Sequence, residues 1–272
     1  GIGDGDTPHN REKGNREKNK KVIDMIKDIT LHYKTPSEIV AFQEERLREA
    51  LAYLQEHSIF YRRMFESNNI DITPIKSIAD LAKIPTTSKQ DLQSHNADFL
   101  CVDPIKVIDY VTTSGTLGEP VTFALTENDL QRLAYNEASS FTMAGCTKED
   151  VIQLMTTIDR RFMAGLAYFL GARELGSGIV RVGNGIPELQ WDTIKRVKST
   201  TCIVVPSFLT KMIEFAEKNN IDHNVSNLKR AICIGEALRT PNGELTTLGS
   251  KIHEKWPTLE LFSTYASTEM QT

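Results

Sequence analysis

Residues 202–218 read CIVVPSFLTKMIEFAEK, a short β-branched run followed by a segment whose apolar residues recur at helical spacing. The same unit recurs along the chain. Six further apolar, β-rich runs lie at 107–111, 121–125, 151–155, 179–182, 231–234 and 259–262. Between some of them, residues 127–144 and 187–198 also read as helices. Alternation of short apolar strands with helices predicts an α/β fold, a mostly parallel sheet with flanking helices.

The first hundred residues lack this alternation of strands and helices. Residues 1–21 hold one apolar residue, which predicts a disordered tail or an expression remnant, with order beginning near Val22. Residues 22–105 are expected to form a helical lead-in, and residues 106–272 the α/β region. Thr35-Pro36-Ser37-Glu38 predicts a capped helix start, with the helix running to about His57. A loop-rich stretch is expected after it, broken by three prolines, Pro74, Pro85 and Pro104.

Composition excludes several classes of protein. Lys and Arg number 32 against 36 Asp and Glu, so no basic excess marks a nucleic-acid partner. No apolar run approaches the roughly 20 residues that span a bilayer, and no secretory leader opens the sequence, so we expect no membrane partner and a cytoplasmic protein. The four cysteines are widely spaced, which favours reduced, packed thiols and no metal held by Cys or His. His223 and His253 are expected at the surface.

The strongest local signal for chemistry is the stretch 112–120, TTSGTLGEP, between two β-like runs. Its hydroxyls and glycines suit a polyphosphate, because backbone and hydroxyl groups can donate to anionic oxygens at close range. It is not a Walker A loop, since no Gly-Lys-Ser/Thr follows the second glycine. A polar turn between two strands explains the same residues, so both interpretations stay open on this stretch alone.

Three stretches together resemble the adenylate-forming (AMP-binding) superfamily. Residues 113–120 resemble its phosphate loop, residues 234–238 (IGEAL) its adenine-packing turn, and residues 265–269 (YASTE) its Tyr-Gly-x-Thr-Glu motif, all in the family's order. Residues 58–62 (SIFYR) and 84–92 (IPTTSKQDL) are similar to the phenylacetate–CoA ligase branch. Residues 162–176 resemble that branch's glycine-rich helix beside the acyl pocket. The resemblance implies the N-terminal portion of such an enzyme, its large domain.

The resemblance implies roles for the phosphate-contacting residues. The β- and γ-phosphates of ATP would be wrapped by the loop residues Thr113, Ser114, Gly115, Thr116 and Gly118. Thr268 would hydrogen-bond the α-phosphate. Glu269 would hold Mg²⁺, a cation that prefers carboxylate and phosphate oxygens. Thr268 and Glu269 are thus the implied catalytic residues.

The resemblance also implies which residues contact the adenine ring and the acyl group. The adenine would lie against Tyr265, with three residues on its other side, Gly235, Glu236 and Ala237. Phe162 would form an aromatic wall of the acyl pocket. The implied reaction is attack of a carboxylate, aryl or arylacetic, on the α-phosphate of ATP, followed by transfer of the acyl group to coenzyme A. Such catalysis is positioning plus charge neutralisation. A homodimer stays open.

The sequence departs from the family pattern. Leu117 removes a hydroxyl donor, Ala266 replaces a glycine, and Glu119 places a carboxylate near the phosphates. In the family pattern, the ribose-binding Asp and the Lys-bearing C-terminal domain lie beyond the position of Thr272. We therefore expect this chain alone to adenylate inefficiently. The alternatives are a truncated nucleotide- or acyl-binding module without turnover, and a nucleotide-dependent transferase with a convergent anion site.

Two weaker signals remain. Gly183-Asn184-Gly185 follows a predicted strand, but Glu188 stands where a dinucleotide fingerprint needs its third glycine, so a strand–helix turn is favoured. Residues 159–161 (DRR) read as a solvated charged turn, with contact to an anionic substrate or to CoA as the other interpretation.

Overall fold

The computed structural model describes residues 29–113 and 118–270. The predicted tail at 1–21 and the predicted onset of order near Val22 lie outside the described residues, as do Ser114, Gly115, Thr116 and Leu117. The chain divides into two compact units, Gly1–Asn128 and Asp129–Thr272.

The first unit begins with a helical segment. A 3₁₀ turn, η1 (Ile29–Tyr33), precedes α2 (Pro36–His57). The predicted capping box is confirmed: Thr35 Oγ1 accepts the Glu38 N–H at 3.4 Å, and Glu38 Oε2 accepts the Thr35 N–H at 2.9 Å. This satisfies backbone donors that a helix start leaves free. Buried side chains of α2 and the following segment, Leu51, Phe65 and Ile75, form the local core.

The stretch expected to be loop-rich contains more helix than the prolines suggested. The missed elements are α3 (Ile59–Ser67), η2 (Ile78–Lys83), α4 (Lys89–Ser94), η3 (Asn96–Phe99) and η4 (Pro104–Lys106). The serines that precede α3 and α4 accept backbone N–H groups of their first turns, so these short helices are locally capped. The unit ends in an antiparallel pair, β1 (Val107–Thr112) and β2 (Thr122–Thr126).

The second unit is a five-stranded, all-parallel sheet in the order β4-β3-β5-β6-β7. Its strands are β3 (Val151–Leu154), β4 (Gly178–Arg181), β5 (Thr201–Val204), β6 (Arg230–Cys233) and β7 (Glu260–Ser263). Its helices are α5 (Glu127–Met143), α6 (Met163–Leu175), α7 (Pro187–Val197), α8 (Pro206–Lys218) and α9 (Thr247–Lys255), with a 3₁₀ turn η5 (His223–Val225). Each predicted strand is present within one residue of its expected bounds, and the predicted α/β fold class is confirmed.

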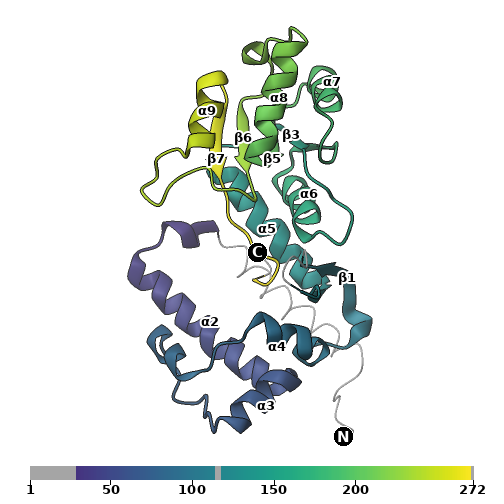
Figure 1. Cartoon of the computed structure of the whole chain (residues 1–272). Coiled ribbons are helices and arrows are strands. Elements are labelled where there is room, and N and C mark those ends of the chain that lie inside the picture. The colour runs from purple at the N-terminus through teal and green to yellow at the C-terminus, as the bar shows by residue number, and fades with distance from the viewer. Residues whose placement is uncertain (1–28, 114–117, 271–272) are drawn as a thin grey trace, which may run out of the picture. The chain divides into compact units, whose positions relative to one another are not determined.

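Helices cover both faces of this sheet (Figure 1). One face packs against α7, α8 and α9, in a core that includes Trp191, Leu209 and Trp256. The other face packs against α5 and α6, through Phe141 and Tyr168 among others. The central strand β5 is buried along its whole length, as expected of a parallel sheet covered on both sides.

The cysteines and His223 test two further expectations. All four cysteines are free, and Cys146, Cys202 and Cys233 are buried, which confirms packed thiols. Burial raises the pKa of the Cys233 thiol to about 12. The surface placement of His223 was wrong. It is buried edge-on against Trp256, with ring centroids 5.2 Å apart, and its Nε2 lies 2.7 Å from the Lys255 carbonyl oxygen.

No helix in the described part of the chain combines the length and the apolar composition needed to cross a bilayer.

Candidate functional site

The candidate site of the second unit is the edge of the sheet at which the parallel strands end. The helices that follow the neighbouring strands β3 and β5, α6 and α8, pack on opposite faces. Their connections therefore leave in opposite directions, which opens a crevice outside the carboxyl ends of these strands. Ligands of open α/β sheets bind at such a switch point. Every site residue predicted in this unit follows β3, β6 or β7.

The turn after β6 is built around Gly235, whose φ of 76° lies in the region that favours glycine. The Glu236 carboxylate accepts the N–H and the Oγ–H of Ser207, each at 2.8 Å. Ser207 lies in the first turn of α8, and Val205 at the cap position makes no side-chain hydrogen bond. Glu236 therefore caps α8 from a neighbouring loop, where the helix dipole also favours its charge. No sequence pattern pointed to Ser207, because it lies 29 positions from Glu236.

The loop after β7 carries Tyr265, Thr268 and Glu269. β7 pairs in parallel with β6, and the Thr264 N–H donates to the Cys233 carbonyl at 3.1 Å. The loop after β7 and the turn after β6 thus start from adjacent strand ends, about 5 Å apart. Tyr265 is 83% exposed, so its ring is free to meet a ligand.

Two local details bear on the loop after β7. Ala266 does not have a positive φ, so the alanine in place of the family's glycine meets no backbone penalty there. The Ser267 hydroxyl donates to Glu269 Oε2 at 2.9 Å. One carboxylate oxygen of the exposed Glu269 is thereby oriented, and no hydrogen bond from a described residue engages the other.

This arrangement fits Mg²⁺, which is commonly held by one or two carboxylates together with substrate phosphates. Among the described residues, no group of three or more His, Cys, Asp or Glu side chains could hold a metal by itself. Glu269 would therefore need phosphate oxygens as co-ligands.

Phe162 follows β3 and stands at the N-cap of α6 without a side-chain hydrogen bond. Its side chain is half-buried. β5 separates β3 from β6, so Phe162 lies on the same edge as Gly235 but two strands away. The structure thus gathers Phe162, the 235–237 turn and the 265–269 loop on one edge.

The Gly183-Asn184-Gly185 turn after β4 is held by a buried amide pair. Gln190 Nε2 donates to the carbonyls of Gly183 at 2.8 Å and Gly185 at 3.2 Å, and Gln153 Nε2 donates to Gln190 Oε1 at 2.7 Å. The Ser199 hydroxyl completes the chain by donating to Gln153 Oε1 at 2.7 Å. The turn is therefore a fixed strand–helix connection, as favoured from the sequence.

The hydroxyl loop belongs to the first unit and connects β1 to β2. Thr113 is buried, and its Oγ1 accepts the Val121 N–H at 3.0 Å, so this hydroxyl helps to close the hairpin. Gly118 has φ 122°, which excludes most other residues. Ser114, Gly115 and Thr116 lie outside the described residues. The loop and Glu269 belong to different units, so their meeting around one triphosphate stays a prediction.

Two amides that the sequence analysis missed hold the end of this loop. Gln93 Nε2 donates to the Glu119 carbonyl at 2.6 Å, and Asn96 Nδ2 donates to the Thr122 carbonyl at 2.8 Å. Both come from the helical lead-in, 26 positions earlier. This anchoring fixes the strand that leaves the loop.

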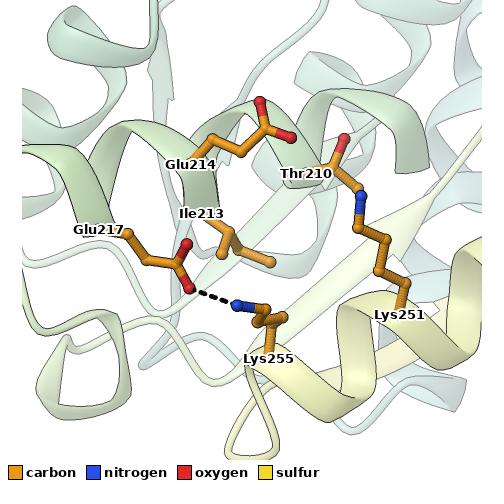
Figure 2. A pocket seen from close by; sticks show the side chains of 6 residues that line it. All are labelled: Thr210, Ile213, Glu214, Glu217, Lys251 and Lys255. Carbon is orange, nitrogen blue, oxygen red and sulfur yellow. Dashed lines mark hydrogen bonds and ion pairs between the residues drawn. The ribbon is translucent and has the colours of Figure 1, made fainter.

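A separate pocket of about 180 Å³ lies on the helical face of the second unit (Figure 2). Its walls are Thr210, Ile213, Glu214 and Glu217 of α8 with Lys251 and Lys255 of α9. The Lys255 ammonium group pairs with Glu217 at 2.9 Å. None of the motif residues lines it, so we place the candidate site at the strand ends instead.

Comparison with known proteins agrees with the resemblance. No protein-family model matches the sequence. The chain is 30% identical over 182 residues to the phenylacetate–coenzyme A ligase of Escherichia coli (strain K12), covering 66% of this chain and 41% of that enzyme. It is 31% identical over 193 residues to the enzyme of the same name from Thermus thermophilus, covering 71% and 43%. The chain is phenylacetate–CoA ligase-like. It spans less than half the length of these curated relatives.

Solved structures show the same fold. The phenylacetate–CoA ligase-like chain matches 2-hydroxyisobutyryl-CoA ligase in complex with 2-HIB-AMP and CoA, with a TM-score of 0.78 over 88% of this chain and 51% of that chain. An open conformation of that ligase gives a TM-score of 0.74. Sequence identity is 22% in both cases, so these matches establish the fold alone.

Proposed function

We propose that this chain is the nucleotide- and acyl-binding portion of an ATP-dependent acid–CoA ligase. In this reaction a carboxylate oxygen attacks the α-phosphate of ATP, pyrophosphate leaves, and the acyl-adenylate then passes its acyl group to the CoA thiol with release of AMP. The observation that carries the proposal is the similarity to phenylacetate–CoA ligases over about two thirds of the chain. The proposal is also supported by the position of Phe162, Gly235 and Tyr265, which all follow strands at the same edge of the parallel sheet.

The residues after β7 contact the reacting phosphate in this proposal. The Thr268 hydroxyl donates to the α-phosphate, where negative charge develops during attack. Glu269 would hold Mg²⁺ through the carboxylate oxygen that does not accept the Ser267 hydroxyl. When bound, the cation neutralises phosphate charge. The β- and γ-phosphates are bound by five residues of the hydroxyl loop, Thr113, Ser114, Gly115, Thr116 and Gly118.

The turn after β6 takes the adenine. Because the Glu236 carboxylate is engaged by Ser207, the backbone of Gly235 and Ala237 is what remains to face the ring. Tyr265, whose ring is exposed, packs on the other side. This division gives Glu236 a positioning role rather than direct contact with the base.

The acid is proposed to be aryl or arylacetic. The similar enzymes from E. coli and T. thermophilus are phenylacetate–CoA ligases. Phe162, half-buried at the start of α6, supplies an aromatic wall, and paired rings gain about 0.5–1.5 kcal/mol beyond the burial of their surface.

Nucleotide binding tests the first step. A thermal-shift titration of the chain with Mg²⁺–ATP should raise the melting temperature, since a ligand that binds only the folded state stabilises it. Glu269→Gln should weaken this effect by about tenfold in Kd, whereas the matched control Glu260→Gln, at the opposite end of β7, should not. No stabilisation at millimolar Mg²⁺–ATP would overturn the proposal.

Turnover is the second step. It distinguishes the ligase from the second candidate, a nucleotide- or acyl-binding module without turnover. Mass spectrometry for acyl-AMP after incubation with ATP and a panel of aryl and arylacetic acids separates the two. Acyl-AMP identifies the ligase half-reaction in this chain, and ATP binding without acyl-AMP identifies the module.

A further inference from the structure

Three arginines follow or occupy the carboxyl ends of the neighbouring strands β3 and β4, and the proposed function leaves them without a role. Arg160 and Arg161 belong to the loop after β3. Arg181 is the last residue of β4 and pairs in register with Leu154, the last residue of β3. All three are exposed. Within residues 29–113 and 118–270, no carboxylate forms an ion pair with any of them. We call these three residues the arginine corner.

The backbone at Arg160 and Arg161 is unusual. Their φ angles are 59° and 60°, a left-handed conformation in which a side chain costs energy and glycine does not. The turn is closed by the Phe162 N–H, which donates to the Asp159 carbonyl at 3.2 Å, and the Thr157 hydroxyl bonds the Asp159 carboxylate. Two consecutive charged residues therefore stand where glycine would be favoured on conformational grounds. Such strain is concentrated at ligand sites.

The chemistry of the corner favours a phosphate ligand. Guanidinium groups are planar and bind phosphate oxygens in pairs. The Arg181 guanidinium lies 5.7 Å from the centroid of the Phe169 ring of α6, which restrains its position. Of the two carboxylates on the adjoining segments, Asp159 is engaged by Thr157, and Glu188 lies in the first turn of α7.

The arginine corner lies away from the residues proposed to bind ATP in the second unit. Neighbouring strands lie about 4.8 Å apart, so β3 is roughly 14 Å from β7 along the sheet and β4 roughly 19 Å. Glu269 follows β7. The arginine corner and Glu269 therefore suit different phosphate groups, with the proposed acyl position at Phe162 beside the corner.

We propose that Arg160, Arg161 and Arg181 bind the phosphate groups of the thiol cosubstrate, coenzyme A. This inference rests on the proposed function, which requires a second phosphorylated ligand to reach the acyl-adenylate. CoA carries a diphosphate and a 3′-phosphate at the end remote from its thiol. The corner binds those phosphates while the thiol arm extends along the strand ends toward the acyl group.

Calorimetric titration of the chain with CoA, dephospho-CoA, pantetheine and ATP tests the inference. The triple variant R160Q/R161Q/R181Q keeps a Cβ at each position. The conformational cost of the left-handed backbone at residues 160 and 161 is therefore the same in the variant and the parent chain. It should bind CoA at least tenfold more weakly and ATP within twofold of the parent chain. Pantetheine, which lacks the phosphates, should show no difference between the two proteins. The affinity of CoA should also fall as salt is raised, because exposed charges are screened.

Matched control variants distinguish binding at the arginine corner from a general effect of removing positive charge. R173Q removes an arginine from the other end of α6 and should leave CoA binding unchanged. R160G/R161G removes the charges while relieving the left-handed backbone, so it should melt at a higher temperature and still bind CoA several-fold more weakly.

The outcomes distinguish this inference from the proposed function. CoA binding that is absent in the parent chain, or equal in the parent and triple variants, overturns the inference even if ATP binds. Equal weakening of ATP and CoA also overturns it, because the corner would then serve one shared nucleotide site. Failure of the chain to bind ATP overturns the proposed function instead.

Discussion

Glu137→Gln should stabilise the folded chain at alkaline pH, because the Glu137 carboxyl is buried. Glu137 lies on α5 and is 7% exposed, where α5 approaches α6 so closely that a Cβ on Gly171 would lie 2.3 Å from the Glu137 Cβ. Burial raises the pKa of the Glu137 carboxyl from 4.5 to about 7. No hydrogen bond or ion pair to a described residue offsets this burial. The carboxylate form is thus disfavoured in the folded state.

The magnitude follows from the shift. The difference, 7 − 4.5 = 2.5, multiplied by about 1.36 kcal/mol per pKa unit, gives about 3 kcal/mol. The folded pKa is the higher one, so this stability is fully present below pH 4.5 and is lost as the pH rises to about 7. Glu137→Gln removes the ionisation. It should therefore be about 3 kcal/mol more stable than the parent at pH 8.5, and nearly equal to it at pH 4.5.

Urea denaturation across pH 4.5–8.5 measures the difference in free energy of unfolding between the two proteins. The control Glu214→Gln, at an exposed position of α8, should show a difference that does not vary with pH in this way. If the Glu137→Gln difference were the same at both ends of the range, the burial argument would be refuted. A direct carboxyl titration by NMR gives an independent check.

The remaining predictions concern packing and capping. Gln190→Leu leaves the Gly183 and Gly185 carbonyls and a Gln153 N–H unpaired and should cost about 2–4 kcal/mol in urea denaturation; an unchanged midpoint would contradict this. Gly171→Ala should cost about 1–3 kcal/mol by overpacking, whereas Gly178→Ala, with ordinary contacts beyond 3.4 Å, should cost much less. Glu236→Ala should cost about 1 kcal/mol as a lost cap, and less in a Ser207→Ala background, where the hydroxyl bond is gone but the backbone N–H at position 207 still donates to Glu236.

The features that the sequence predicted are local ones. The Thr35–Glu38 capping box needs four consecutive residues, and the strands need four to six, so pattern and propensity suffice. The predicted motif residues of the second unit also follow strands, so a parallel sheet places them on one edge. The strand order could not be predicted from the sequence, however, because it depends on which face of the sheet each crossover connection covers.

The features that were missed depend on distant partners. His223 is set in polar sequence yet buried, because Trp256 and the Lys255 carbonyl, more than 30 positions away, cover it. Gln93 and Asn96 hold the hydroxyl loop from a segment that looked like a connector. In each case a side chain bonds a backbone group far along the chain, and such bonds leave no spacing pattern to read.

The order of the strands adds a constraint that the motifs do not carry. β5 lies between β3, which precedes Phe162, and β6, which precedes Gly235. A ligand that reaches from the proposed acyl wall to the proposed adenine turn must therefore cross the end of β5, where Val205, Pro206 and Ser207 begin α8. The Ser207 N–H and hydroxyl are already held by Glu236, so this helix start has less capacity to bind the reacting phosphate. The charge that develops there must be met from the loop after β7, which makes Thr268 and Glu269 the groups on which the proposed chemistry depends.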